Sequence, residues 1–195
     1  MYYGDELGMV NAVIPADRVR DPLEKRIPEM GLGRDPCRTP MQWDESPHAG
    51  FSTAEPWLPI SDDYSEVNVA AETADAGSLL TLYRRLLELR RVHAALTVGD
   101  YEPVAMTGDL VAYIRRTPGQ GRDARRSDGQ PVIGEAFLVA LNLGAGPYEL
   151  SLASLGLRGR VTMSTHLDRT DDANTQSVAL RANEGVIVQL APVAA

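Results

Sequence analysis

The sequence of 195 residues has few of the residues on which several common kinds of site depend. It contains one cysteine, Cys37, so an internal disulfide bond is excluded. Neither this cysteine nor any of the three histidines belongs to a cluster with the spacing of metal ligands. We therefore expect no metal site and no other cofactor.

Long apolar runs and an excess of positive charge are also missing. No run of 18 apolar residues occurs, so no segment is expected to span a membrane. The net charge of −8 argues against a nucleic-acid partner. The first residues, Met1-Tyr2-Tyr3-Gly4-Asp5, lack the basic and apolar regions of a secretory signal, and we expect a cytoplasmic protein.

The chain does contain a proline-rich segment, residues 27–64, that is dense in polar and aromatic groups. At its centre lies Gly33-Arg34-Asp35-Pro36-Cys37-Arg38-Thr39-Pro40-Met41-Gln42-Trp43-Asp44. Its prolines fix φ and remove backbone donors, so no long helix or central strand can run through it. A long, irregular segment rich in Arg, Asp and Trp is typical of a binding site or of packing against another domain.

Helices are expected on either side of this segment. Leu79, Leu82, Leu86 and Leu89 recur at helical spacing, which predicts an amphipathic helix over about 78–93 that needs a partner surface. Asp21-Pro22 is a cap-and-first-residue pair, so a short helix is expected within 17–26. A third helical region is expected to begin at 67–71.

From Tyr101 onward the apolar residues alternate, which is typical of strands. The expected strands are 101–105, 110–115, 136–143, 148–152, 161–164, 178–180 and 186–190. Several short strands separated by turn signals favour an antiparallel β-sandwich. Residues 117–134 have almost no apolar side chains, and we interpret them as a mobile, solvated loop rather than a basic binding patch.

Three segments resemble, in the same order, the end of the glycoside hydrolase family 13 enzymes of the α-glucosidase and oligo-1,6-glucosidase branch. Met1-Tyr2-Tyr3-Gly4-Asp5-Glu6-Leu7-Gly8-Met9 is similar to the end of their eighth barrel strand, and the Arg-Thr-Pro-Met-Gln-Trp-Asp run to a late barrel loop. The helix at 78–93 is similar to their last barrel helix. The resemblance implies an α+β fragment, with the end of a (β/α)8 barrel over 1–96 and a C-terminal β-sandwich domain over 97–195.

Length limits what this chain can hold, because a (β/α)8 barrel takes about 250 residues. The resemblance therefore implies the C-terminal portion of a retaining α-glucosidase that acts on α-linked gluco-oligosaccharides, with the N-terminal barrel portion as its missing partner. In the family the nucleophilic aspartate, the acid/base glutamate and a third aspartate precede the segment that Tyr2-Tyr3-Gly4 resembles. We assign no catalytic residue and expect the chain to be inactive alone.

Arg34 is the foremost candidate for substrate binding. A guanidinium offers several donors to sugar hydroxyls and can be oriented by a carboxylate. In the resembled enzymes the arginine of this Arg-Asp pair helps to form the pocket for the terminal, non-reducing glucose. The alternative is a structural salt bridge from Arg34 to Asp35 or Asp44.

Four further residues are weaker candidates. We expect Asp35 to clamp Arg34 or Arg38, although it could touch sugar, and Glu6 to bond backbone near the pocket floor. Trp43 and Trp57 could stack on a pyranose ring, but core packing is favoured for both.

Two other functions compete with the enzyme-fragment interpretation. A non-catalytic carbohydrate-binding module would need an aromatic platform on the β domain, and we interpret its aromatic residues, Tyr101, Tyr113, Phe137 and Tyr148, as core. The other alternative, a docking subunit of a split glycosidase, predicts the same role for each residue as the enzyme-fragment interpretation does.

Overall fold

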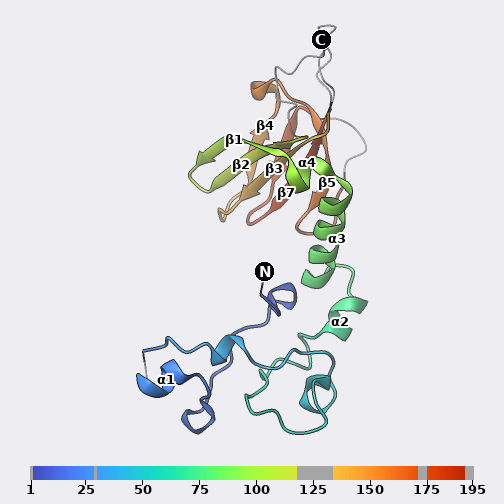
Figure 1. Cartoon of the computed structure of the whole chain (residues 1–195). Helices are drawn as coiled ribbons and strands as arrows, with labels where there is room; N and C mark the ends of the chain where they lie inside the picture. The colour runs from blue at the N-terminus through green and yellow to red at the C-terminus, as the bar shows by residue number, and fades with distance from the viewer. Residues whose placement is uncertain (1, 29, 118–133, 171–174, 192–195) are drawn as a thin grey trace. The chain divides into compact units, whose positions relative to one another are not determined.

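The computed structural model describes residues 2–28, 30–117, 134–170 and 175–191 (Figure 1). It divides into two compact units, Met1–Arg84 and Arg85–Ala195. The boundary between residues 96 and 97 stays a prediction. The expected mobile loop at 117–134 lies almost entirely outside the described residues.

The first unit consists mostly of irregular backbone, as the prolines predict. Its α-helices are α1, Pro22–Arg26, and α2, Val69–Ala74. Single 3-10 turns lie at Asp5–Leu7, Ala16–Arg18, Asp35–Cys37 and Pro47–Gly50. Tyr2 and Tyr3 have no paired strand among the described residues and lead into the turn at Asp5–Leu7, so the strand end expected there stays a prediction.

Side-chain caps explain where the two helices of this unit begin. The Asp21 carboxylate accepts a hydrogen bond from Leu23 N at 2.9 Å, with Pro22 as the first helical residue of α1. The Asn68 side chain accepts from Ala71 N at 2.8 Å and caps α2. Both contacts satisfy N–H groups that a helix start leaves without partners.

The long amphipathic helix forms as predicted. Helix α3 spans Leu79–Val92 and is followed by α4, Ala94–Val98. The Arg90 Nη1 donates to Leu96 O at 2.8 Å and joins the end of one helix to the other. The predicted leucine face is incompletely covered, since Leu79 is 37% exposed and Leu82, Leu86 and Leu89 are only half-buried. The buried leucine of this helix is Leu80, which lies outside that face.

All seven expected strands are present. A five-stranded antiparallel sheet has the order β1-β2-β3-β7-β5, and a two-stranded antiparallel sheet pairs β4 with β6 (Figure 1). Their bounds are β1 Asp100–Thr107, β2 Leu110–Arg116, β3 Ala136–Asn142, β4 Tyr148–Ser151, β5 Gly159–Ser164, β6 Ser177–Leu180 and β7 Gly185–Leu190. Pro103 lies in the edge strand β1, where a missing N–H is tolerated.

One hydrophobic cluster contains side chains from both sheets. Leu138 of β3 and Val188 of β7 are fully buried in it, and Leu150, Val178 and Leu180 of the β4–β6 pair are buried beside them. A smaller cluster places Ala95 and Leu96 of α4 against Phe137. The alternating strand pattern therefore produces a core within the second unit.

The core assignment of the four aromatic residues was only partly right. Phe137 is fully buried and Tyr113 is half-buried, but Tyr101 and Tyr148 are exposed. The rings of Tyr101 and Tyr113 lie 5.2 Å apart. Alternation predicts which residues share a face, but it does not say whether a second layer covers that face.

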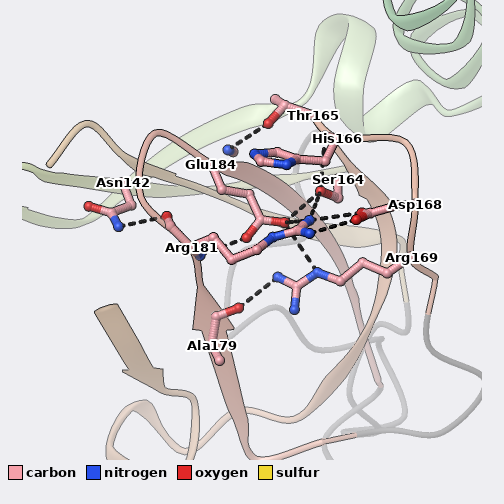
Figure 2. Close-up of polar contacts among 10 residues, drawn as sticks. Asn142, Ser164, Thr165, His166, Asp168, Arg169, Ala179, Arg181 and Glu184 are labelled. Atoms are coloured by element: carbon pink, nitrogen blue, oxygen red, sulfur yellow. Dashed lines mark hydrogen bonds and ion pairs between the residues drawn. The ribbon is translucent and has the colours of Figure 1, made fainter. Parts of the chain in front are cut away.

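The second unit also contains a polar cluster around the buried Glu184, the Glu184 cluster, formed by Ser164, Asp168, Arg169, Arg181 and Glu184 (Figure 2). The Glu184 carboxylate accepts from Ser164 Oγ at 2.6 Å and from Arg181 Nη2 at 2.7 Å. Arg181 also pairs with Asp168, at 2.5 Å. The cluster joins the end of β5 to the residues between β6 and β7.

Charge pairing lowers the pKa of both carboxylates. Burial alone would raise the pKa of Glu184, but hydrogen bonds from Arg181 and Ser164 outweigh it and bring it to about 2. The Arg181 hydrogen bond lowers the pKa of Asp168 to about 2. Both groups are therefore ionised at neutral pH.

Candidate functional site

The side chain of Arg34 is anchored at one end. Its Nε donates to Asp21 Oδ2 at 2.7 Å, and its backbone N donates to the same oxygen at 3.1 Å. The Asp21 side chain is 1% exposed, whereas that of Arg34 is 57% exposed. The guanidinium is thus held by a buried carboxylate while much of it stays open to solvent.

The same contacts leave the Nη1 and Nη2 groups of the guanidinium largely unengaged. Nη2 makes only a long contact of 3.5 Å with Asp21 Oδ1, and Nη1 has no hydrogen-bond partner among the described residues. The hydrogen bond from Arg34 holds the pKa of Asp21 well below its usual range, and Asp21 in turn raises the pKa of Arg34. Both groups are therefore ionised, and 57% of the Arg34 side chain remains exposed.

Asp35 does not clamp an arginine side chain, contrary to expectation. Its Oδ2 accepts from the backbone N of Arg20 at 2.5 Å and from that of Asp21 at 2.8 Å. The Asp35 side chain is buried, and buried polar groups in proteins almost always have hydrogen-bond partners. Here those partners are two backbone N–H groups. Asp35 therefore fixes the segment that carries Asp21.

The salt-bridge alternative for Arg34 named the wrong partners. Neither Asp35 nor Asp44 pairs with its guanidinium: Asp44 accepts from the backbone N of Ser46 at 2.8 Å and from the Ser46 hydroxyl. The partner is Asp21, which the sequence identified only as a helix cap. Its separation of 13 residues from Arg34 gave no local signal of the contact.

An aromatic cavity of about 400 Å³ lies in the same unit. It is lined by Tyr3, Glu6, Arg38, Thr39, Pro40, Met41, Trp43, Phe51, Trp57 and Leu58. The core packing favoured for the two tryptophans was wrong in this structure, because Trp43 is 49% exposed and Trp57 is 70% exposed. The described residues supply no surface that covers these rings.

Glu6 makes the backbone contact that the sequence analysis expected. Its Oε2 accepts from Gly4 N at 2.9 Å, and its side chain lines the aromatic cavity. Tyr3 fixes the adjoining wall, since its hydroxyl donates to Thr39 O at 2.9 Å. A role for Glu6 in binding a ligand stays a prediction.

Among the residues placed in the structure, no group of three or more His, Cys, Asp or Glu side chains could hold a metal ion. In the same part of the chain, no helix has the length and apolar character needed to cross a membrane.

Comparison with known proteins identifies the family. The model of the α-amylase catalytic domain matches residues 1–99. The salivary α-glucosidase of Aedes aegypti is 32% identical over 199 residues, which cover 96% of this chain and 32% of that protein. The oligo-1,6-glucosidase of Parageobacillus thermoglucosidasius is 34% identical over 137 residues, covering 61% of this chain and 24% of that protein.

Solved structures give the same result. The trehalulose synthase MutB from Pseudomonas mesoacidophila MX-45 matches 96% of this chain with a TM-score of 0.74 and 28% identity, over 34% of its own length. The α-glucosyl transfer enzyme XgtA matches 97% of this chain with a TM-score of 0.75 and 26% identity. The chain thus spans about a third or less of the length of these relatives. It belongs to the α-amylase family, glycoside hydrolase family 13.

Proposed function

We propose that this chain is the C-terminal portion of a retaining α-glucosidase that acts on α-linked gluco-oligosaccharides once the rest of the barrel is present. One observation carries the proposal: the Arg34 guanidinium is anchored by a buried carboxylate, while more than half of its side chain is exposed. The names of the curated relatives, which include α-glucosidases and oligo-1,6-glucosidases, support this substrate class.

In this proposal Arg34 donates to hydroxyls of the terminal glucose. A cation that is already oriented loses little conformational freedom when a ligand binds, so its hydrogen bonds contribute more to affinity. Asp35 fixes the backbone that carries Asp21 and does not itself touch sugar. Glu6, bonded to Gly4 N, lines the aromatic cavity of the same unit.

The first unit has too little cover for its apolar side chains. Among its described residues the buried apolar side chains are Leu7, Ala49, Leu58 and Leu80. Its large exposed apolar residues are Tyr2, Tyr3, Val10, Val13, Leu23, Ile27, Met30, Leu32, Trp43, Phe51, Trp57 and Leu79. Four of them, Tyr3, Trp43, Phe51 and Trp57, gather around one cavity, and a clustered exposed apolar surface of this kind is typical of an interaction site. We propose that the partner at this surface is the remainder of the barrel.

The proposal also assigns domains. Residues 1–96 would complete the barrel, and residues 97–195 would form the C-terminal β-sandwich domain, built from the two sheets that share one core. The buried carboxylates are engaged elsewhere: Asp21 with Arg34, Asp35 with backbone, and Glu184 with Arg181 and Ser164. In line with the family resemblance, we propose that the catalytic carboxylates lie in the remainder of the barrel.

Reconstitution tests the proposal. The chain would replace the matching C-terminal part of the Parageobacillus thermoglucosidasius oligo-1,6-glucosidase, and hydrolysis of maltose and isomaltose would be measured. We expect activity in the chimera and none in that barrel portion without a C-terminal part. A chimera that folds, judged by its circular dichroism and thermal unfolding, and yet does not hydrolyse either sugar would contradict the proposal.

A carbohydrate-binding module is the second candidate, because Tyr101 and Tyr113 form a ring pair with Tyr101 57% exposed. Titration of the unmodified chain with maltose would test this function. Chemical-shift changes centred on these two tyrosines and lost in Tyr101→Ala would favour a module.

A further inference from the structure

Two segments, one around Asp21 and one around Arg34, are joined by hydrogen bonds. Each segment supplies carboxylates that accept from backbone N–H groups of the other. Asp21 accepts from the backbone N and the Nε of Arg34, while Asp35, the next residue, accepts from the backbone N of Arg20 and Asp21. Glu24 adds a third link, since its Oε2 accepts from Gly33 N at 2.9 Å. Residues 20–24 and 33–35 therefore hold each other in register.

Within this pair of segments Asp21 makes two distinct kinds of contact. Its Oδ1 accepts from Leu23 N at 2.9 Å and caps α1, whereas its Oδ2 receives both short contacts from Arg34. The side chain is almost completely buried, and a buried carboxylate with four N–H partners cannot rotate without losing several of them. The position of Oδ2 thus fixes the direction of the Arg34 side chain.

We infer that Asp21 is the positioning residue for the substrate-binding arginine: it holds Arg34 by Nε so that the Nη edge faces the terminal glucose. This inference rests on the proposed function for the use that Arg34 makes of its free edge. A guanidinium attached only through its flexible stem would sample several rotamers and would pay their entropy on binding. Asp21 removes that cost before the sugar arrives.

The competing explanation is that Asp21 serves only as a helix cap. Substitution with serine separates the two roles, because serine is a good N-cap but provides no carboxylate for Arg34. Asp21→Asn is a second variant: its side-chain oxygen can still accept from Leu23 N, but an NH₂ group then faces the Arg34 donors. Asp44→Asn is the matched control, since Asp44 is a loop aspartate that does not contact Arg34.

The first experiment uses the 195-residue chain and records hydrogen exchange of the Arg34 Nε–H by ¹H–¹⁵N NMR. We expect exchange about tenfold or more slower than for the exposed Arg26. This protection should disappear in D21S and D21N and persist in D44N. Persistence of the slow exchange in D21S, with α1 intact by amide exchange, would overturn the inference.

The second experiment is a double-mutant cycle that measures kcat/KM. It uses the chimera of this chain with the oligo-1,6-glucosidase barrel portion, which we call the reconstituted enzyme. D21S should lower kcat/KM on the order of 10- to 100-fold when Arg34 is present and change it little in the R34A background. Equal losses in both backgrounds would overturn the positioning role while leaving the proposed function intact. If R34A itself retained normal kcat/KM, the proposed use of Arg34 would fail instead.

Discussion

At the residue scale, the properties of Arg34 depend on a contact that its neighbours in sequence do not reveal. The Arg-Asp pair marked the segment as a candidate site, and its prolines predicted a fixed loop. The actual partner, Asp21, is 13 residues away, and its carboxylate also had an evident local role as a helix cap. A pairing set by the fold of an irregular loop cannot be predicted from periodicity, because no repeat relates the two positions.

Removing the guanidinium tests the substrate-binding role. In the reconstituted enzyme, Arg34→Ala should lower kcat/KM about 30- to 1000-fold, because a charged contact to the sugar is lost and Asp21 is left unpaired. Arg34→Lys should restore little of the lost kcat/KM, since an ammonium group cannot reproduce the planar arrangement of donors of a guanidinium. Steady-state kinetics would measure both. Arg26→Ala, which alters an exposed arginine of α1, should remain near normal.

Glu184 should make the stability of the chain sensitive to acid. Its folded pKa of about 2 lies below its ordinary value of 4.5, so its contribution is complete above about pH 4.5 and is lost as the pH falls toward 2. Glu184→Gln should lower the free energy of unfolding at neutral pH and flatten its decline in acid. Urea unfolding followed by circular dichroism would show this. The exposed Glu149→Gln should keep the wild-type profile.

At the element scale, periodicity predicted much more than it did at the residue scale. The seven strands and the helix at 78–93 all form within a few residues of their expected bounds, because each repeats one pattern over several positions. Exposure was less predictable: Trp43, Trp57 and Tyr101 remain open to solvent although they were expected to be covered. Whether an apolar side chain is covered depends on a second surface, and the local pattern holds no information about it.

Asn142, at the end of β3, gives a test at this scale. Its Nδ2 donates to Gly146 O and Arg181 O, both at 2.8 Å, and its Oδ1 accepts from Gly144 N at 3.1 Å. Asn142→Ala would remove all three hydrogen bonds of a buried side chain and leave the buried Gly144 N without its partner, so it should destabilise the chain by about 2–4 kcal/mol. Thermal unfolding would measure the loss. Leu143→Ala, at the adjacent exposed position, should change stability by less than about 0.5 kcal/mol.

At the scale of the whole molecule, the two units differ in what stabilises them. The buried hydrophobic clusters of the described residues lie in the second unit, whereas the first unit has few buried apolar side chains. Limited proteolysis should therefore remove residues 1–84 and leave a resistant piece that begins between residues 85 and 98. Mass spectrometry would locate the cuts. A resistant core made of the first unit would show that it needs no partner surface.

The central claim is that this chain supplies part of a sugar-binding pocket but not the catalytic carboxylates. It is tested most directly by measuring hydrolysis of 4-nitrophenyl α-glucoside by the purified 195-residue chain. We predict no turnover above the blank, because a retaining glycosidase needs two carboxyl groups about 5 Å apart and our proposal assigns both to the remainder of the barrel. Turnover that disappears when a single acidic residue of this chain is replaced would contradict the account.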